Sequence, residues 1–287
     1  MTAQLLSGSI DEVADFGETP YGIVKRLRAV ERWASRVCQW REKEALSILD
    51  YGCGTGDHVT YPLARLGHYV LGVDCHVRSI DEATHRFQLP NLAFRVADID
   101  QLVREGATYD LVICSEVLEH MHEPLPFLRQ IRALVGKQGG LIITTPNGYG
   151  AFEWLSALER LFDRMGMNQA LRRVLRAVRR PADDRISGGR SSDRDSAIGF
   201  LNMDSKHVQF FGLARLESLF SSGGFRIADR QARTVLCGPY VDNLFHLMPF
   251  RERLYRLNCE AAERLPMAWA ADWMYLLQAE EGRSREQ

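Results

Sequence analysis

The chain has 287 residues, of which 46% are hydrophobic and 25% charged, and its formal net charge at pH 7 is -1. This composition is typical of a globular protein with enough apolar residues for one large core, and the balanced charge excludes a general electrostatic attraction to nucleic acid. The sequence shows no run of about 18 apolar residues that could cross a membrane, no signal peptide in Met1–Ser9 and no C-x-x-C pair among its six cysteines, so we expect a cytoplasmic protein with reduced thiols.

Helical spacing of apolar residues marks the N-terminal region. Ile23, Leu27, Val30 and Ala34 recur at the spacing of one helix face within residues 10–40, and basic residues stand between them. We therefore expect residues 1–44 to form a helical cap on the main domain. The basic side chains are expected on the solvated face of this helix rather than in contact with a substrate. They are Lys25, Arg26, Arg28, Arg32 and Arg36.

A glycine-rich turn follows the first predicted strand. The apolar run 45–49 indicates a short buried strand, and Asp50–Asp57 follow it before residues that can begin a helix. Alternate glycines let the backbone turn tightly and let a ligand approach the main chain. The spacing G-x-G-x-G differs from the G-x-G-x-x-G of dinucleotide-binding folds, and Asp50 would repel a pyrophosphate but suits an ammonium group. The turn predicts a ligand site, unless its glycines only shape a loop.

An acid ends the second predicted strand. This strand covers residues 69–73, and Asp74 follows it 22 positions after Gly52. The distance is close to the spacing of about 20 residues at which an acid after the second strand bonds the ribose hydroxyls of a nucleotide. A carboxylate suits this role because it can accept hydrogen bonds from two neighbouring hydroxyls. Together with the glycine turn, Asp74 is predicted to bind a ribose; taken alone, it could be a helix cap.

The fourth predicted strand, 109–115, leads into the segment E-V-L-E-H. Open α/β sheets place their ligands at the carboxyl ends of parallel strands, so Ser115, Glu116 and His120 are expected near a ligand. A histidine of near-neutral pKa is a natural proton acceptor at such a place. An orienting or structural role explains the position of His120 almost as well.

Strands and helices alternate through the first half of the chain. The alternation repeats five times up to the strand 141–145, and two late strands are predicted at 225–228 and 272–277. Right-handed crossovers then produce an α/β fold with a doubly wound, mostly parallel seven-stranded sheet. A helical region is expected between the last two strands, over residues 241–264.

The pattern D-x-G-x-G-x-G resembles the first motif of class I S-adenosylmethionine-dependent methyltransferases, and the resemblance extends over residues 45–145. It implies a Rossmann-like fold, S-adenosyl-L-methionine as cofactor and S-adenosyl-L-homocysteine as product. In that family an acid after the third strand takes the adenine amino group, and the next apolar residue lies on the ring; Asp98 and Ile99 match, although Asp98 could instead be a cap or turn residue. Ser115 and Glu116 would border the methionine portion. The implied cofactor site consists of Asp50, Gly52, Cys53, Gly54, Gly56, Asp74, Cys75, Asp98, Ile99, Ser115 and Glu116.

Three further segments, E-V-L-E-H, T-T-P-N and the later H-V-x-F-F, resemble the small-molecule methyltransferases related to the O-methyltransferases of ubiquinone biosynthesis. The resemblance implies methyl transfer to an oxygen, in preference to nitrogen or carbon, of a phenol or quinol, a lipid-linked compound or a natural-product intermediate. A phenol, with a pKa near 10, needs only the help of a base such as His120 or His207. Residue spacing shows no metal site, although scattered Asp and Glu could still assemble one for magnesium.

Residues 151–206 interrupt the pattern after the fifth strand. They predict two amphipathic helices, and the second, 171–180, has an apolar stripe opposite five arginines. This insertion is expected to be a lid or a weak peripheral contact with a membrane, and a solvated basic face is the alternative. The chain is thus expected to be one domain, with the cap 1–44, a cofactor-binding core 45–150, the insertion 151–206 and a C-terminal part of the sheet in 207–287.

A small-molecule acceptor is the expected partner of this domain. Nucleic-acid acceptors are disfavoured because no N-P-P-Y-like segment follows the fourth strand to hold a flipped base. Two other functions stay open: a protein methyltransferase, and a non-catalytic S-adenosylmethionine-binding or scaffold protein, which the fold alone permits. Turnover of the cofactor in the presence of an acceptor separates an enzyme from a scaffold. The sequence does not indicate an oligomeric state.

Overall fold

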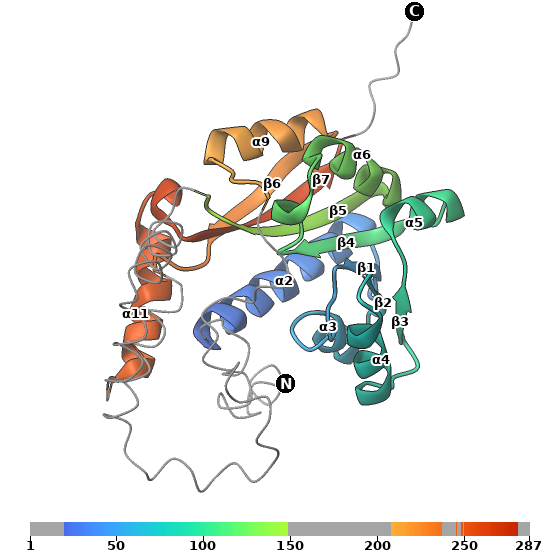
Figure 1. Ribbon diagram of the computed structural model, residues 1–287, viewed down its shortest axis with the longest axis horizontal. Coiled ribbons are helices and arrows are strands. Elements are labelled where there is room, and N and C mark those ends of the chain that lie inside the picture. Colours follow the sequence, from blue (N-terminus) through green and yellow to red (C-terminus); the bar gives the residue numbers. More distant parts are fainter. Residues whose placement is uncertain (1–19, 149–207, 237–244, 246–247, 249, 281–287) are drawn as a thin grey trace, which may run out of the picture.

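The computed structural model describes residues 20–148, 208–236, 245, 248 and 250–280 (Figure 1). Within these residues a seven-stranded sheet lies between helices that cover both of its faces. The strands are β1 Ser47–Tyr51, β2 Tyr69–Asp74, β3 Leu92–Val96, β4 Tyr109–Ser115, β5 Val135–Pro146, β6 Phe225–Ala232 and β7 Asp272–Ala279.

The strand order is β3-β2-β1-β4-β5-β7-β6. Strands β1 to β5 pair in parallel, whereas β7 runs antiparallel to both β5 and β6. The sheet is therefore mostly parallel, and the predicted fold class is confirmed. The order of the strands reverses between β1 and β4, and open α/β sheets bind ligands in the crevice at such a switch point.

Helices pack on the two faces of the sheet through separate apolar clusters. One cluster includes Leu102, Phe127 and Phe220, so α5, α6 and α9 cover one face; the other includes Trp33 and Leu63, so α2 and α3 cover the opposite face (Figure 1). The helices are α2 Pro20–Arg41, α3 Thr60–Arg65, α4 Val77–Arg86, α5 Ile99–Glu105, α6 Pro124–Leu134, α9 Leu213–Ser222 and α11 Arg251–Arg264, with the short 3-10 helices η2 Leu118–His120 and η4 Met267–Trp269. None of the helices in the described ranges is long and apolar enough to cross a membrane.

The central strand β4 shows why the sheet forms where the sequence predicts it. Its residues Leu111, Val112, Ile113 and Cys114 are all 0% exposed. A strand with helices on both faces has no solvated side, so its residues are continuously apolar instead of alternating. The carboxyl end of β4 is thereby fixed in the middle of the molecule, and the residues that follow it lie beside the end of β1.

Asp110 anchors the start of the sheet to the N-terminal helix. Its side chain is 3% exposed and accepts hydrogen bonds from Arg41, Lys43 and the backbone N–H of Ser47, each at 2.9 Å. Burial alone would raise the pKa of this carboxyl, but the bonds from Lys43, Ser47 and Arg41 outweigh burial and lower the pKa to about 2. The end of α2, the start of β1 and the start of β4 are thus joined at one charged group.

Two element boundaries differ from the sequence-based expectation. The fifth strand begins at Val135, not at 141, because Val135 pairs with Tyr109 after α6 ends at Leu134. Gly136, Gly139 and Gly140 therefore lie within a long strand. The helical region expected over 241–264 appears as α11, Arg251–Arg264, in its described part.

Several predictions concern residues outside the described ranges. They include the start of the helical cap before residue 20, the whole insertion 151–206 with its basic segment 171–180, and His207. The lid and the membrane contact proposed for this insertion stay predictions. The described part of the cap is α2, which packs against the sheet through Val30, Trp33 and Val37.

We predict that Asp110 makes stability depend on acid pH. Because its folded-state pKa of about 2 lies below the ordinary value of 3.8, its stabilising contribution is complete above about pH 4 and is lost as the pH falls toward 2. The free energy of unfolding can be measured in urea at pH 4 and at pH 2. Its fall between these two pH values should be about 2 kcal/mol smaller in Asp110→Asn than in the wild type. The exposed Asp81→Asn is the control, and curves for Asp110→Asn and the wild type that stay parallel would contradict the prediction.

Candidate functional site

The glycine turn between β1 and α3 is built from three left-handed backbone positions. Gly52, Gly54 and Gly56 have φ angles of +79°, +54° and +76°, which side chains with a Cβ rarely adopt. The N–H of Gly52 donates to the carbonyl of Val73 at 2.7 Å, which ties the turn to the end of β2. A Cβ on Gly52 would lie 2.5 Å from Cγ2 of Val117, so the turn also touches the segment after β4. The helix begins only at Thr60, so further turn residues separate it from the glycines.

Asp50 supports the turn from inside the protein. Its side chain is buried, with an exposed fraction of 2%, and accepts a hydrogen bond from Oγ1 of Thr60 at 2.6 Å. Burial raises the pKa of Asp50 to about 6, against the effects of the Thr60 bond and of the nearby Arg26 charge. Asp50 thus lies beneath the surface of the turn and braces the start of α3.

Asp74 holds the opposite side of the turn at the end of β2. One carboxylate oxygen accepts from the N–H of Gly54 at 2.9 Å, and the other accepts from the N–H of His76 at 2.8 Å. The side chain is only partly buried, so a ligand can reach it from solvent. Cys75 beside it is exposed, whereas burial raises the pKa of Cys53 in the turn and keeps its thiol neutral.

Asp98 and Ile99 follow β3 at the same edge of the sheet. Asp98 is exposed and caps α5, because its Oδ1 accepts from the N–H of Gln101 at 2.7 Å. The cap role that the sequence left open is therefore present. Ile99 is partly buried and packs on the core below. The cap uses one carboxylate oxygen and leaves a second acceptor on the same side chain.

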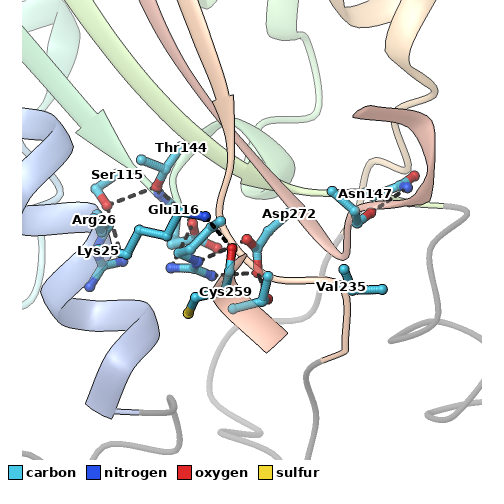
Figure 2. A network of polar contacts seen from close by, with 12 residues as sticks. Lys25, Arg26, Ser115, Glu116, Thr144, Asn147, Val235, Cys259 and Asp272 are labelled. Atoms are coloured by element: carbon cyan, nitrogen blue, oxygen red, sulfur yellow. Dashed lines mark hydrogen bonds and ion pairs between the residues drawn. The ribbon is translucent and has the colours of Figure 1, made fainter. Parts of the chain in front are cut away.

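Ser115 and Glu116 meet Thr144 where β4 and β5 end. Ser115 Oγ lies 2.9 Å from Thr144 Oγ1, which in turn donates to Glu116 Oε1 at 2.7 Å. Glu116 has a φ of +56°, an uncommon conformation for a residue with a side chain, and its N–H donates to the carbonyl of Thr144 at 3.0 Å. Figure 2 shows these side chains gathered at the ends of the two strands.

Arg26 is a site residue that the sequence analysis assigned wrongly. It was expected on the solvated face of the helix, but its exposed fraction is 4% and it donates to Ser115 Oγ at 3.3 Å (Figure 2). Another guanidinium nitrogen lies 3.5 Å from Nδ1 of His58, beyond the glycine turn. Its spacing contained the signal, since Arg26 stands three residues after Ile23 and four before Val30, on the apolar face. A buried cation thus lies between the turn and β4.

Glu119 and His120 close the segment after β4. Glu119 is 1% exposed and accepts from Oγ1 of Thr145 at 3.2 Å, and burial, followed by the nearby Glu116 charge, raises its pKa well above the ordinary value. His120 is the last residue of η2 and is partly exposed, consistent with a place at the acceptor side. Among the residues that the structure describes, no group of three or more His, Cys, Asp or Glu side chains is arranged to hold a metal ion.

A model of a protein family described as "Methyltransferase domain" matches residues 24–229. The chain belongs to this methyltransferase family. The family resemblance predicted from the glycine turn and the strand ends is thereby confirmed, and the match covers every described site residue predicted from the sequence. It ends before the last part of β6 and before β7.

The curated relatives of this methyltransferase match through part of their length. The ubiquinone biosynthesis O-methyltransferase of Caulobacter sp. (strain K31) is 39% identical over 107 residues, which are 36% of this chain and 42% of that protein. The enzyme of the same name from Methylocella silvestris is 41% identical over 104 residues, 36% of this chain and 40% of that protein. The chain therefore spans about two-fifths of the length of these relatives.

Solved structures of other methyltransferases share the fold. The plantazolicin methyltransferase BpumL, in complex with a desmethyl analogue and SAH, superposes with a TM-score of 0.52 at 17% identity over 95% of this chain and 90% of its own. The magnesium protoporphyrin IX methyltransferase of Synechocystis PCC 6803 with bound SAH superposes with a TM-score of 0.50 at 16% identity, over 91% and 87%. At these identities the likeness shows the fold alone.

We predict that Gly52→Ala destabilises the methyltransferase more than an equivalent change elsewhere. The new methyl group would collide with Val117 and force the loop apart, and overpacking of this kind costs about 1–3 kcal/mol in addition to the backbone strain. Gly67→Ala is the matched control, because Gly67 also has a positive φ, +94°, but a Cβ added there would meet nothing within 4 Å.

Urea unfolding of the two variants measures the difference. The further change Val117→Ala should restore part of the stability of Gly52→Ala, since it removes the colliding Cγ2. Equal losses for Gly52→Ala and Gly67→Ala would show that the contact with Val117 does not constrain the turn.

Proposed function

We propose that the protein is an S-adenosylmethionine-dependent O-methyltransferase that acts on a small-molecule acceptor. The observation that carries the proposal is the glycine turn with Asp74 bound to it, at the switch point of the sheet, in a chain of the methyltransferase family. The name of the relatives, ubiquinone biosynthesis O-methyltransferase, supports an oxygen as the methylated atom. A hydroxyl on an aromatic ring is the acceptor that we favour, because a phenol ionises with a pKa near 10 and needs little activation.

The residues around the turn fit this cofactor. Each carboxylate oxygen of Asp74 accepts one backbone N–H and retains a lone pair that can accept from a ribose hydroxyl. Asp98 and Ile99 follow β3, the strand next to β2, which ends at Asp74. From there Asp98 can accept from the adenine amino group, and Ile99 can lie on the face of the ring. The positive φ angles bring bare backbone to the surface of the turn, where a ligand can approach without meeting a Cβ.

Arg26 is proposed to hold the carboxylate of the methionine portion. Guanidinium groups bind carboxylates through paired, charge-assisted hydrogen bonds, and a buried site strengthens them. Arg26 already contacts Ser115 and approaches His58, so its position is fixed before any ligand arrives. The nearby charge of Arg26 acts to lower the pKa of Asp50. The two groups are therefore close enough for their opposite charges to balance.

The remaining residues would orient the acceptor and take its proton. When bound, S-adenosylmethionine supplies an electrophilic methyl group for an in-line displacement, so the protein has mainly to align the nucleophilic oxygen and exclude water. Glu116, which borders the methionine portion in the family resemblance, is proposed to face the acceptor as well, because its side chain is 28% exposed and Thr144 holds one of its oxygens. His120 is the proposed general base, since it follows the same strand end and is exposed enough to meet an acceptor hydroxyl. His207 stays a second candidate base outside the described residues.

Two other functions are tested by the same measurements. A scaffold that binds the cofactor without turnover would form no S-adenosylhomocysteine with any acceptor, although its affinity would be normal. A protein methyltransferase would transfer the methyl group to a polypeptide and leave simple phenols unmodified. Formation of S-adenosylhomocysteine with a catechol probe separates both from the proposed activity.

We predict that Asp74→Ala weakens cofactor binding. Loss of charge-assisted hydrogen bonds to the ribose should raise the Kd for S-adenosylmethionine about 10- to 100-fold, measured by calorimetry. The exposed Asp81→Ala, on the following helix, is the matched control and should bind as the wild type does. An unchanged Kd in Asp74→Ala, or tighter binding of NAD than of S-adenosylmethionine by the wild type, would contradict the assignment.

We predict that His120→Ala separates binding from turnover. The Kd for S-adenosylmethionine should stay within about threefold of the wild type, whereas kcat with a catechol acceptor should fall by about 10²- to 10⁴-fold, the usual contribution of a general base. The loss should be smaller at pH values at which the acceptor ionises without help. If kcat changes by less than about threefold at pH 7, His120 has an orienting or structural role instead.

A further inference from the structure

Arg233 lies just beyond β6 and forms a buried ion pair with the first residue of β7. Its side chain is 8% exposed, and that of Asp272 is 3% exposed. Nε of Arg233 lies 2.9 Å from Oδ1 of Asp272, and Nη2 donates to Oδ2 at 3.0 Å, so the contact is a two-point one. Both residues stand outside the family match, which ends at residue 229. The pair therefore belongs to the part of the chain that the family model does not describe.

Neighbouring hydrogen bonds fix this pair in place. Oγ1 of Thr234 donates to the same Asp272 oxygen at 3.1 Å, and the backbone N–H of Arg233 donates to the carbonyl of Asp272 at 3.2 Å. The N–H of Ala271 donates to the carbonyl of Thr234 at 2.8 Å. A buried carboxylate held this way keeps the guanidinium of Arg233 in one orientation. Figure 2 shows Asp272 in the same group of polar side chains as Glu116.

The remaining terminal nitrogen of Arg233 is directed to the candidate site. Nη1 lies 3.8 Å from Oε1 of Glu116, the same oxygen that accepts from Thr144. Glu116 is therefore bounded by a hydroxyl from β5 and by a guanidinium from the end of β6. Its left-handed backbone, with φ +56°, puts a strained residue at this point, and such residues persist where their surroundings hold them.

A role limited to joining β6 and β7 does not explain this arrangement. Two of the three guanidinium nitrogens already contact Asp272, and the strands are paired by backbone bonds over Phe225–Ala232. Two neutral side chains in place of Arg233 and Asp272 would fill the same space without desolvating charges, which is costly in a buried site. The contact with Glu116 gives the cation a second role, because its charge lies beside the neighbouring carboxyls of Glu116 and the buried Glu119.

We infer that Arg233 is a positioning residue that holds the carboxylate of Glu116 toward the acceptor, while Asp272 holds Arg233. This inference rests on the proposed methyltransferase function. Small displacements of a group that aligns reactants can cost about 100-fold in rate, so loss of Arg233 should affect turnover far more than cofactor binding. In this inference Glu116 contacts the acceptor, and Arg233 acts only by holding Glu116.

A double-mutant cycle tests the inference in the full chain. Arg233→Met removes the charge and keeps much of the volume; with labelled S-adenosylmethionine and catechol as the acceptor probe, it should lower kcat about 10- to 100-fold and leave the cofactor Kd within about threefold. In the Glu116→Gln background the same change should alter kcat by less than about threefold, because the group through which it acts is already lost. Arg230→Met, which changes an exposed side chain of β6 three residues before Arg233, is the matched control and should match the wild type.

A structural role for Arg233 gives a different result. It would lower kcat by the same factor in both backgrounds, and that outcome overturns the inference. The melting temperature does not separate the two roles, because loss of Arg233 leaves Asp272 buried without its cation in either case. Asp272→Asn is a second, milder variant for the case in which Arg233→Met does not fold; it should produce a smaller loss of kcat that is likewise absent in the Glu116→Gln background.

A crystal structure of Arg233→Met with S-adenosylhomocysteine tests the same point without an acceptor. The Glu116 carboxylate should leave the hydroxyl of Thr144, and an unchanged Glu116 would overturn the inference. Failure of the wild type to bind S-adenosylmethionine, or to methylate catechol, would instead count against the proposed function, while the position of Glu116 in the variant still decides the role of Arg233.

Discussion

The contact between Gly52 and Val117 leaves space for a hydrogen atom and for nothing larger, and the rest of the site depends on it. Gly52 belongs to the turn after β1, and Val117 belongs to the segment after β4. These are the two strands between which the order of the sheet reverses. Because the Gly52 backbone lies against the Val117 side chain, the residues on either side of the contact, Asp74 on one and Ser115 with Glu116 on the other, are brought to the same edge of the sheet.

The charges at this edge of the sheet come from opposite ends of the chain. Arg26 reaches it from α2 and bonds Ser115, whereas Arg233 reaches it from the end of β6 and approaches Glu116. Thr144 connects the two, since its hydroxyl contacts both Ser115 and Glu116. Each cation has an acidic residue nearby, Asp50 for the first and Asp272 for the second. The arrangement keeps buried charges compensated and lets helices and strands that are distant in sequence support one short segment.

The sequence was informative wherever a local pattern decides the structure. The apolar run of β4, the three glycines and the acid after β2 are each explained by neighbouring residues, and the strands and the class of fold followed from them. Arg26 was misplaced because its charge was given more weight than its position on the apolar face of the helix. The fifth strand was expected to begin at 141 because the apolar run begins there, whereas pairing of Val135 with Tyr109 begins β5 six residues earlier.

The pair Arg233 and Asp272 shows a different limit of the sequence. The one available signal is an acid in the otherwise apolar run that becomes β7, and nothing in the spacing indicates its partner. The two residues meet because β6 and β7 are antiparallel neighbours, which depends on the order of the whole sheet. Contacts of this kind, between side chains far apart in sequence, follow from topology and not from local propensity.

The main chain beside Glu119 has a consequence for the way this fold can change. The carbonyl of Glu119 accepts from the N–H groups of Val208 and Gln209, both at 3.0 Å, and the N–H of Gly148 donates to the carbonyl of Phe211 at 3.1 Å. The two described residues that flank 149–207 are thus fastened to the same part of the protein. The entropy of closing a loop between fastened ends grows only slowly with its length. Sequences of very different size can therefore be exchanged between these two points during evolution, while the sheet and the glycine turn remain as they are.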